Sequence, residues 1–126
     1  MTGLHRTLAA GLVASLAACS GGLRNVEAYR ADTTKLLATR SAQLQRCYND
    51  ALQADGKAAG TVTVQFVIEK DTGAISRSTV EPSHSTAPPA LGRCVVKAIN
   101  GLVLAPPDGK EGRATFVYEF QPAPAT

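Results

Sequence analysis

The 126-residue chain has little excess charge, and its basic residues are not gathered in one place. The formal net charge is +3, and it falls to +2 if residues 1–18, which contain Arg6, are removed. The remaining Lys and Arg residues are scattered from Arg24 to Arg113 and have acidic neighbours, so no basic stripe could follow a phosphate backbone. The composition therefore argues against nucleic-acid binding.

The sequence also lacks the residue groupings that usually carry chemistry. No Cys-x-x-Cys pair occurs among the three cysteines, which argues against metal binding and dithiol redox chemistry. His84 lies between Ser83 and Ser85, and side chains of sequence neighbours diverge too far to form a catalytic pair. Asp50 and Asp55 are candidates for a pair of catalytic carboxylates, but they are five residues apart near the expected end of a helix. This position is more typical of a residue on a solvated face and a residue that caps the helix. We therefore expect no catalytic, cofactor-binding or metal-binding residues, and no small-molecule substrate.

No apolar run in the sequence is long enough to cross a bilayer, and this includes the run at the N-terminus. It extends from Leu8 to Ala17 and follows Arg6, which is the layout of a secretory signal. The run ends in Leu-Ala-Ala-Cys at residues 16–19, and this resembles the lipobox of bacterial lipoproteins. The resemblance implies cleavage before Cys19 and a diacylglycerol on its thiol. The alternative is an ordinary signal peptide cut at small residues, with Cys19 merely nearby.

Lipidation would make this a membrane-anchored envelope lipoprotein. The mature chain would begin at Cys19 and be held by acyl chains, palmitate among them, without spanning the membrane. We expect residues 19–35 to form the lipid anchor and a tether or stalk. The favoured location is the outer membrane, facing the periplasm.

Export also bears on Cys47 and Cys94, which remain as an even pair once Cys19 carries lipid. An oxidising compartment favours a disulfide between them, and closing a loop of this length would contribute about 4 kcal/mol by chain entropy. The alternative is that both are small buried core residues.

The segment from Gly60 to Glu81 predicts the β-hairpin around which the rest is arranged. Apolar side chains recur at every second position of residues 62–68, as in a strand with one buried face. Asp-Thr-Gly at residues 71–73 ends the run with a glycine that can take positive φ. Ile75 and Val80 in the following strand are an odd number of residues apart, so their side chains cannot both point to the same face of a regular strand. We expect either a bulge between them or a strand that is regular over only one half.

Helical patterns flank this hairpin. The first starts near Val26, has a weak stripe up to Thr34 and a clear one from Leu37 to Leu52, and ends at Asp55-Gly56. The second follows Pro88-Pro89 and has its apolar face from Leu91 to Leu102. We expect Ser85 or Thr86 to cap it.

Apolar side chains occupy every second position from Arg113 to Phe120, which predicts a third strand. Residues 121–126 are expected to form a disordered tail. The order is helix, strand, strand, helix, strand. The expected fold class is α+β, with a three-stranded antiparallel sheet of strand order 2-1-3 and two helices on one face, in a domain of residues 36–120.

This pattern resembles the TonB C-terminal-like domain, and within it the myxobacterial branch named the AgmX/PglI C-terminal domain. The similarity covers about Leu36 to Phe120. It depends on the following residues: Cys47-Tyr48, Gly60–Ile68, Gly73–Ile75, Val80, Ser83, Leu91–Ile99 with Cys94-Val95, Leu104–Pro107, Gly109 and Phe116–Phe120.

The resemblance implies a non-catalytic periplasmic domain that binds a protein partner by strand addition at a sheet edge, near motility or envelope machinery. A three-stranded sheet has two open edges, which supports the same interpretation. Thr115, Val117 and Glu119 are the candidate partner-binding residues of the last strand. The alternative function is a structural, disulfide-clamped subunit that packs in an envelope complex through its helices. A lipid anchor cannot draw on an inner-membrane proton motor, so energy transduction is not expected.

Overall fold

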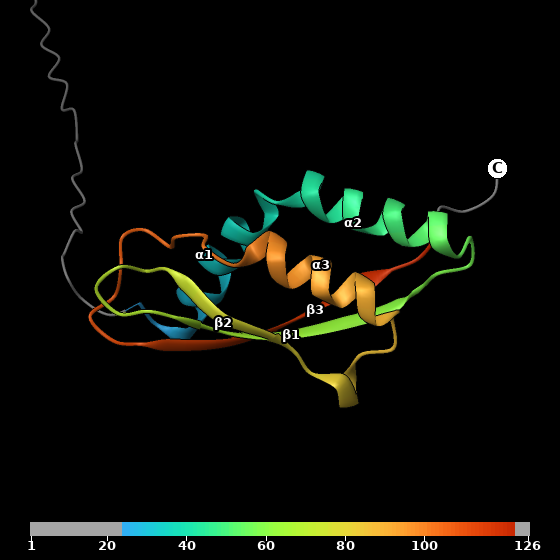
Figure 1. The fold of residues 1–126 in the computed structure, drawn as a ribbon. Coiled ribbons are helices and arrows are strands. Elements are labelled where there is room, and N and C mark those ends of the chain that lie inside the picture. Colours follow the sequence, from blue (N-terminus) through green and yellow to red (C-terminus); the bar gives the residue numbers. More distant parts are fainter. Residues whose placement is uncertain (1–23, 123–126) are drawn as a thin grey trace, which may run out of the picture.

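The computed structural model describes residues 24–122, and the fold within them has helices on one side of a three-stranded sheet (Figure 1). The predicted lipobox with Cys19, the leader before it and residues 123–126 of the predicted tail lie outside the described residues. The elements in chain order are α1 (Val26–Ala38), α2 (Ser41–Ala54), β1 (Gly60–Ile68), β2 (Ile75–Val80), the short 3-10 helix η2 (Pro82–His84), α3 (Pro89–Ile99) and β3 (Gly112–Phe120).

The sheet has β1 at its centre, in the order β2-β1-β3, and both neighbours are antiparallel to β1. Between β1 and β3 the register is continuous, from Gly60 opposite Phe120 to Ile68 opposite Gly112. This confirms the predicted α+β class, the strand order and the antiparallel pairing.

The bulge predicted in β2 is also present. The register between β1 and β2 shifts between Gln65 and Val67, and Arg77 on β2 has a φ of 54°. The extra residue explains why Ile75 is buried although it differs in parity from Val80, which packs against the same core.

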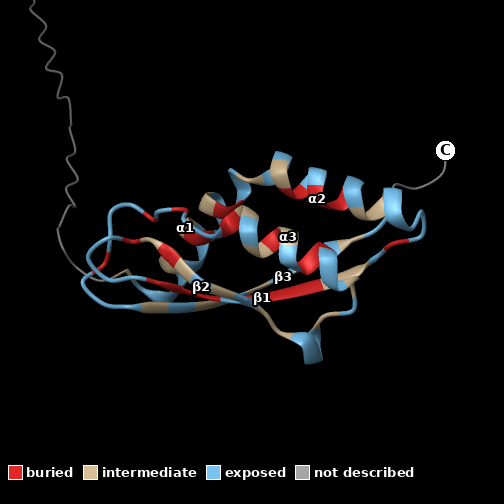
Figure 2. Ribbon diagram, viewed as in Figure 1, coloured by how far each residue is buried: buried red, intermediate tan, exposed pale blue. Residues whose placement is uncertain are grey.

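The core lies between the sheet and the helices, where the buried segments of β1, α2 and α3 face one another (Figure 2). The alternating apolar side chains of residues 62–68 point into it, and Val64 is fully buried. Helix α3 adds Leu91, Val95 and Ile99 at helical spacing, and α2 adds Leu44, Cys47 and Tyr48. Apolar burial on one face of each element therefore fixes the layers.

The long first helix expected from the sequence is divided into α1 and α2 at Thr39 and Arg40. The amide of Arg40 donates to Leu37 O at 3.0 Å, a short-range bond that ends α1. The hydroxyl of Thr39 donates to Leu36 O at 2.6 Å, and the hydroxyl of Ser41 donates to Ala38 O at 2.7 Å. These local side-chain bonds compete with continuation of the helical backbone.

Helix α1 packs on the same core as the other helices. Thr33 is 1% exposed and Leu37 is buried among the core residues, with Tyr29 and Leu36 packed beside them. The packed unit therefore includes residues 24–35, which the sequence assigned to a tether or stalk.

The expected cap on α3 is wrong. Pro88 precedes that helix, and no side chain in the described part of the protein caps it. The hydroxyls of Ser85 and Thr86 instead accept the amide protons of Thr63 and Thr61, each at 2.9 Å. The segment around η2, which projects on the side of the sheet opposite the helices (Figure 1), thereby covers the edge of β1 beyond the end of β2.

Candidate functional site

Strand β3 forms one edge of the sheet along its nine residues. Burial alternates along it: every second residue from Gly112 to Phe120 is partly buried, and those between are exposed. The partly buried set packs on the core through aromatic contacts, with Phe116 stacked on Phe66 at 6.0 Å between ring centroids and Phe120 against Tyr48 at 5.3 Å. The predicted residues Thr115, Val117 and Glu119 are all in the exposed set.

The direction of the backbone groups on β3 follows from the bonds that β1 makes on its other side. In an antiparallel ladder the N–H and C=O of one residue point to the same side, and those of the next residue to the opposite side. Thr61 and Thr63 direct theirs toward residues 81–87. The alternate residues of β1 therefore face β3 and pair there with the even-numbered residues. The odd-numbered residues of β3 therefore direct their N–H and C=O groups outward, away from β1. These residues are Arg113, Thr115, Val117 and Glu119.

The opposite edge of the sheet is less suited to pairing with another chain. Strand β2 has six residues, against nine in β3, and it is interrupted by the bulge at Arg77. Bulges and short length are features that blunt an edge, because they disturb the ladder that an added strand must follow. Within the described residues, β3 is consequently the long regular edge.

A groove of about 590 Å³ runs beside β3, with α1 as its other wall. Apolar side chains are open to solvent on both walls: Val26 of α1 is 73% exposed and Val117 of β3 is 61% exposed. The residues that line it are Arg24, Val26, Tyr29, Arg30, Thr33 and Thr34 on the helix side and Gly112–Val117 on the strand side.

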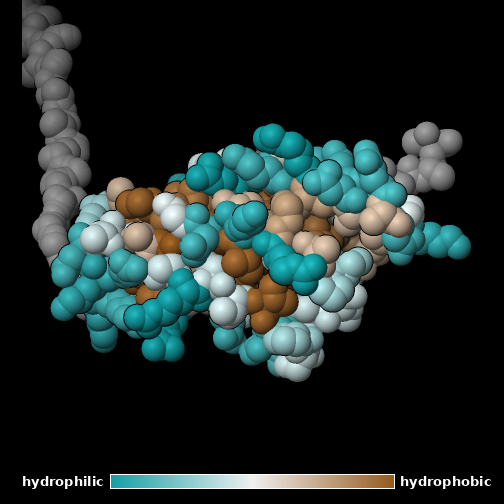
Figure 3. All heavy atoms as spheres, in the orientation of Figure 1, coloured by the Kyte–Doolittle hydropathy of each residue, from teal (hydrophilic) through white to brown (hydrophobic). Residues whose placement is uncertain are grey.

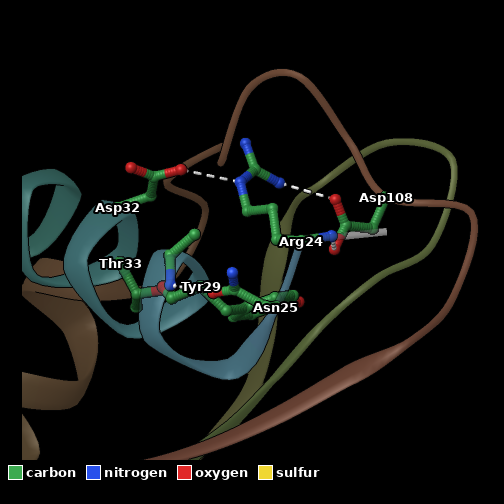
Figure 4. A network of polar contacts seen from close by, with 7 residues as sticks. Arg24, Asn25, Tyr29, Asp32, Thr33 and Asp108 are labelled. Carbon is green, nitrogen blue, oxygen red and sulfur yellow. Dashed lines mark hydrogen bonds and ion pairs between the residues drawn. The ribbon is translucent and has the colours of Figure 1, made fainter. Parts of the chain in front are cut away.

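The position of α1 beside β3 is fixed by Arg24, which joins the start of the helix to the loop before β3 (Figure 4). Its guanidinium donates to Asp108 Oδ1 and Asp32 Oδ2, each at 2.7 Å. The side chains of Arg24 and Asp108 are only 11% and 7% exposed, so this pair is shielded from solvent. Asn25 accepts the amide proton of Ala28 at 2.7 Å and caps the helix.

Tyr29 of α1 lies directly against Gly112 of β3. A Cβ on Gly112 would collide with the Tyr29 hydroxyl and would lie 2.6 Å from the ring carbon that bears it. The hydroxyl is buried and has no hydrogen-bond partner in the described part of the chain. Burial and, to a lesser extent, the negative charge of Asp108 raise the pKa of Tyr29, and the positive charge of Arg24 opposes them.

The two cysteines expected to pair are bonded to each other. Cys47 of α2 and Cys94 of α3 form a disulfide with their Cα atoms 5.7 Å apart, which confirms the predicted bridge between neighbouring helices. His84 is exposed in η2, and its Nδ1 lies 3.1 Å from the hydroxyl of the adjacent Ser83.

The groove contains residues that the sequence analysis did not select. Arg24, Tyr29 and Arg30 line the groove. Arg24 is paired with Asp108, which is 84 positions away in sequence. The one local indication was the weak apolar stripe of residues 26–34, which is what a helix with a single narrow contact to the core would show.

Among residues 24–122, no group of three or more His, Cys, Asp or Glu side chains is arranged to hold a metal ion. No helix in the same range has the length and apolar character needed to traverse a bilayer. Comparison with protein-family models, with curated proteins and with solved structures found no match to this chain.

Proposed function

We propose that this domain binds a protein partner by adding a strand of that partner to the free edge of β3. The observation that carries the proposal is the row of outward N–H and C=O groups on a regular nine-residue edge, beside a groove of about 590 Å³. Main-chain hydrogen bonds along such an edge supply affinity, and pockets for alternate side chains supply specificity. The resemblance to the TonB C-terminal-like domain points to the same mode of binding.

The lipid anchor belongs to the same proposal. Cys19 is the expected site of lipidation, and it precedes the first described residue, Arg24, by only a few positions. A short connection of this kind would keep the groove close to the membrane surface, where the partner would be an envelope protein. Mass spectrometry of the mature protein tests this part, since an unmodified Cys19 would rule the anchor out.

Packing through the helices is the alternative, and the outward faces of the helices favour it less. In Figure 3 hydrophilic side chains cover α2, whereas apolar side chains gather between α3 and the sheet. The exposed residues of α2 include Gln45, Arg46, Asn49 and Asp50, and the cores of stable interfaces are depleted in charged residues.

Site-specific photo-crosslinking in the native envelope distinguishes the two modes of binding. A photoreactive amino acid is placed at Glu119, beside the proposed contact, or at Arg46 on α2. Strand addition predicts a specific adduct from position 119 that disappears when Val117→Pro is added and persists with Val117→Thr. Proline removes an outward N–H without breaking a bond to β1, so the fold should be kept. An adduct from position 46 alone, or one at position 119 that survives the proline, would refute strand addition.

A further inference from the structure

We propose that the segment accepted by this groove carries a carboxylate opposite the start of β3 and an apolar side chain further along. This inference rests on the strand addition proposed above, and it adds the chemistry of the partner. The argument begins with the charges that line the groove.

The charged residues that line the groove, within the described part of the chain, are all arginines: Arg24, Arg30 and Arg113. Arg24 is already neutralised by Asp32 and Asp108. Arg30 is exposed on α1. Arg113 is 78% exposed and has a loose contact with Glu111 at 3.6 Å, a distance and exposure at which an ion pair is weak and easily exchanged. Two guanidinium groups are therefore available to an incoming anion.

A strand added to β3 would lie about 4.8 Å outward from it, in the space between β3 and α1. Side chains directly opposite one another on adjacent strands project to the same face and interact. A partner residue opposite Arg113 is therefore placed to form a carboxylate pair, since the guanidinium matches a carboxylate with two parallel hydrogen bonds.

The apolar requirement comes from the exposed Val117, which lies on the same face of β3 as Arg113 and four residues along. Val26 on the opposite wall adds a second exposed apolar side chain. An added strand would cover Val117 with an apolar residue four positions away from its carboxylate. The preferred partner is thus an extended peptide segment with an acidic residue at that spacing from an aliphatic or aromatic one.

Selection from a displayed library of random peptides about twelve residues long, enough to span the nine residues of β3, tests this specificity. Three forms of the protein are compared: the unchanged chain, Arg30→Glu with Arg113→Glu, and Arg46→Glu with Arg93→Glu. The last pair changes net charge equally, but its arginines are exposed on α2 and α3, outside the groove. We expect Asp and Glu to be enriched on the unchanged chain and on the control, and Lys and Arg to be enriched on the groove variant.

An affinity measurement on one enriched peptide then gives the size of the effect. Replacing its acidic residue by the corresponding amide should weaken binding to the unchanged chain about fivefold, and replacing it by Lys should weaken binding more than about tenfold, as expected for solvent-accessible ion pairs. Raising the salt concentration should reduce these differences, because both arginines are exposed.

The outcomes that overturn this inference differ from those that overturn the proposed function. Selected peptides that lose binding on Val117→Pro but show no acidic bias contradict the charge specificity and leave strand addition standing. Peptides that bind Val117→Pro as well as the unchanged chain contradict strand addition itself. The absence of any enriched peptide refutes this inference, as does a dimer of the chain in which Arg113 pairs with Glu119 of a second copy. Urea unfolding of each variant confirms that the fold is intact.

Discussion

Gly112 lies directly against Tyr29 of α1, so the packing of α1 should be sensitive to one added methyl group at this position. Gly112→Ala would drive a Cβ into Tyr29. We expect a loss of about 1–3 kcal/mol in the free energy of unfolding, as for other overpacked sites, measured by urea denaturation.

Gly109→Ala is the matched control for this substitution. Among the atoms of residues 24–122 outside its chain neighbours, none lies within 4 Å of the position that a Cβ on Gly109 would take, and Gly109 is exposed in the same stretch of chain. Its free energy of unfolding should stay within about 0.5 kcal/mol of the unchanged protein. Equal effects at the two glycines would mean that α1 does not rest on Gly112.

Tyr118 is the residue whose ionisation should make stability depend on alkaline pH. Burial raises its pKa from 10.0 to about 12, because the charged phenolate is poorly solvated in the fold. Between these values the unfolded chain releases a proton that the folded chain keeps. Ionisation of Tyr118 therefore leaves the free energy of unfolding unchanged below pH 10 and lowers it as the pH rises toward 12. The midpoint of thermal unfolding, measured across this range, should fall.

Tyr118→Phe separates this contribution from those of other groups that titrate in alkali. The Tyr118 hydroxyl is buried without a partner in the described residues, so its removal should raise the free energy of unfolding by about 1 kcal/mol near neutral pH. The variant should also lose part of the alkaline slope. Parallel curves for the two proteins above pH 10 would contradict this assignment.

Among the elements, α1 is held to the rest of the fold by the contacts of Arg24 with Asp108 as well as by apolar packing. Asp108→Asn keeps the shape of the side chain but removes the charge that faces Arg24, leaving a largely shielded guanidinium with Asp32 alone. We expect a loss of about 1–3 kcal/mol. Amide hydrogen exchange should be faster in α1, while exchange in β1 changes only with global stability.

Glu111→Gln provides the control on the same loop. Its contact with Arg113 is long and exposed, so its removal should change stability by less than about 0.5 kcal/mol. If α1 exchanges at the same rate in both variants, the Arg24–Asp108 pair does not hold the helix.

The strands could be predicted from the sequence better than the helices, and the reason is the range of the interactions. Alternation in β1 and β3 and the parity change in β2 are local consequences of one buried face, so they can be recognised without any partner. The break at Thr39 depends on hydroxyl bonds to nearby carbonyls, which the apolar pattern does not reveal. The position of α1 depends on the contact between Arg24 and Asp108, which are 84 residues apart in sequence. A local pattern of apolar residues gives no information about such a contact.

At the scale of the whole molecule, the disulfide between Cys47 and Cys94 joins two helices over a separation of 47 residues. Replacing both cysteines by serine should lower the free energy of unfolding by about 4 kcal/mol, because the unfolded chain regains the freedom of that loop. Urea denaturation of the oxidised protein and the double variant measures this. A difference below about 1 kcal/mol would show that the bridge constrains the chain little.

The proposed binding site could be predicted in part from the sequence. The sequence placed Thr115, Val117 and Glu119 on one face of the last strand, and the fold places them on a free edge. It did not predict the arginines that give this edge its charge, since Arg30 lies in a helix that was expected to be a stalk.

Amide hydrogen exchange on β3, with and without a bound peptide, is the most direct measurement of strand addition. The amides of Thr115, Val117 and Glu119 point outward in the free protein, so a peptide that pairs with the edge should slow their exchange at least about tenfold. The amides of Phe116 and Tyr118 already face β1 and should change little. A peptide that binds tightly while the amides of Thr115, Val117 and Glu119 exchange as fast as before would contradict binding by strand addition.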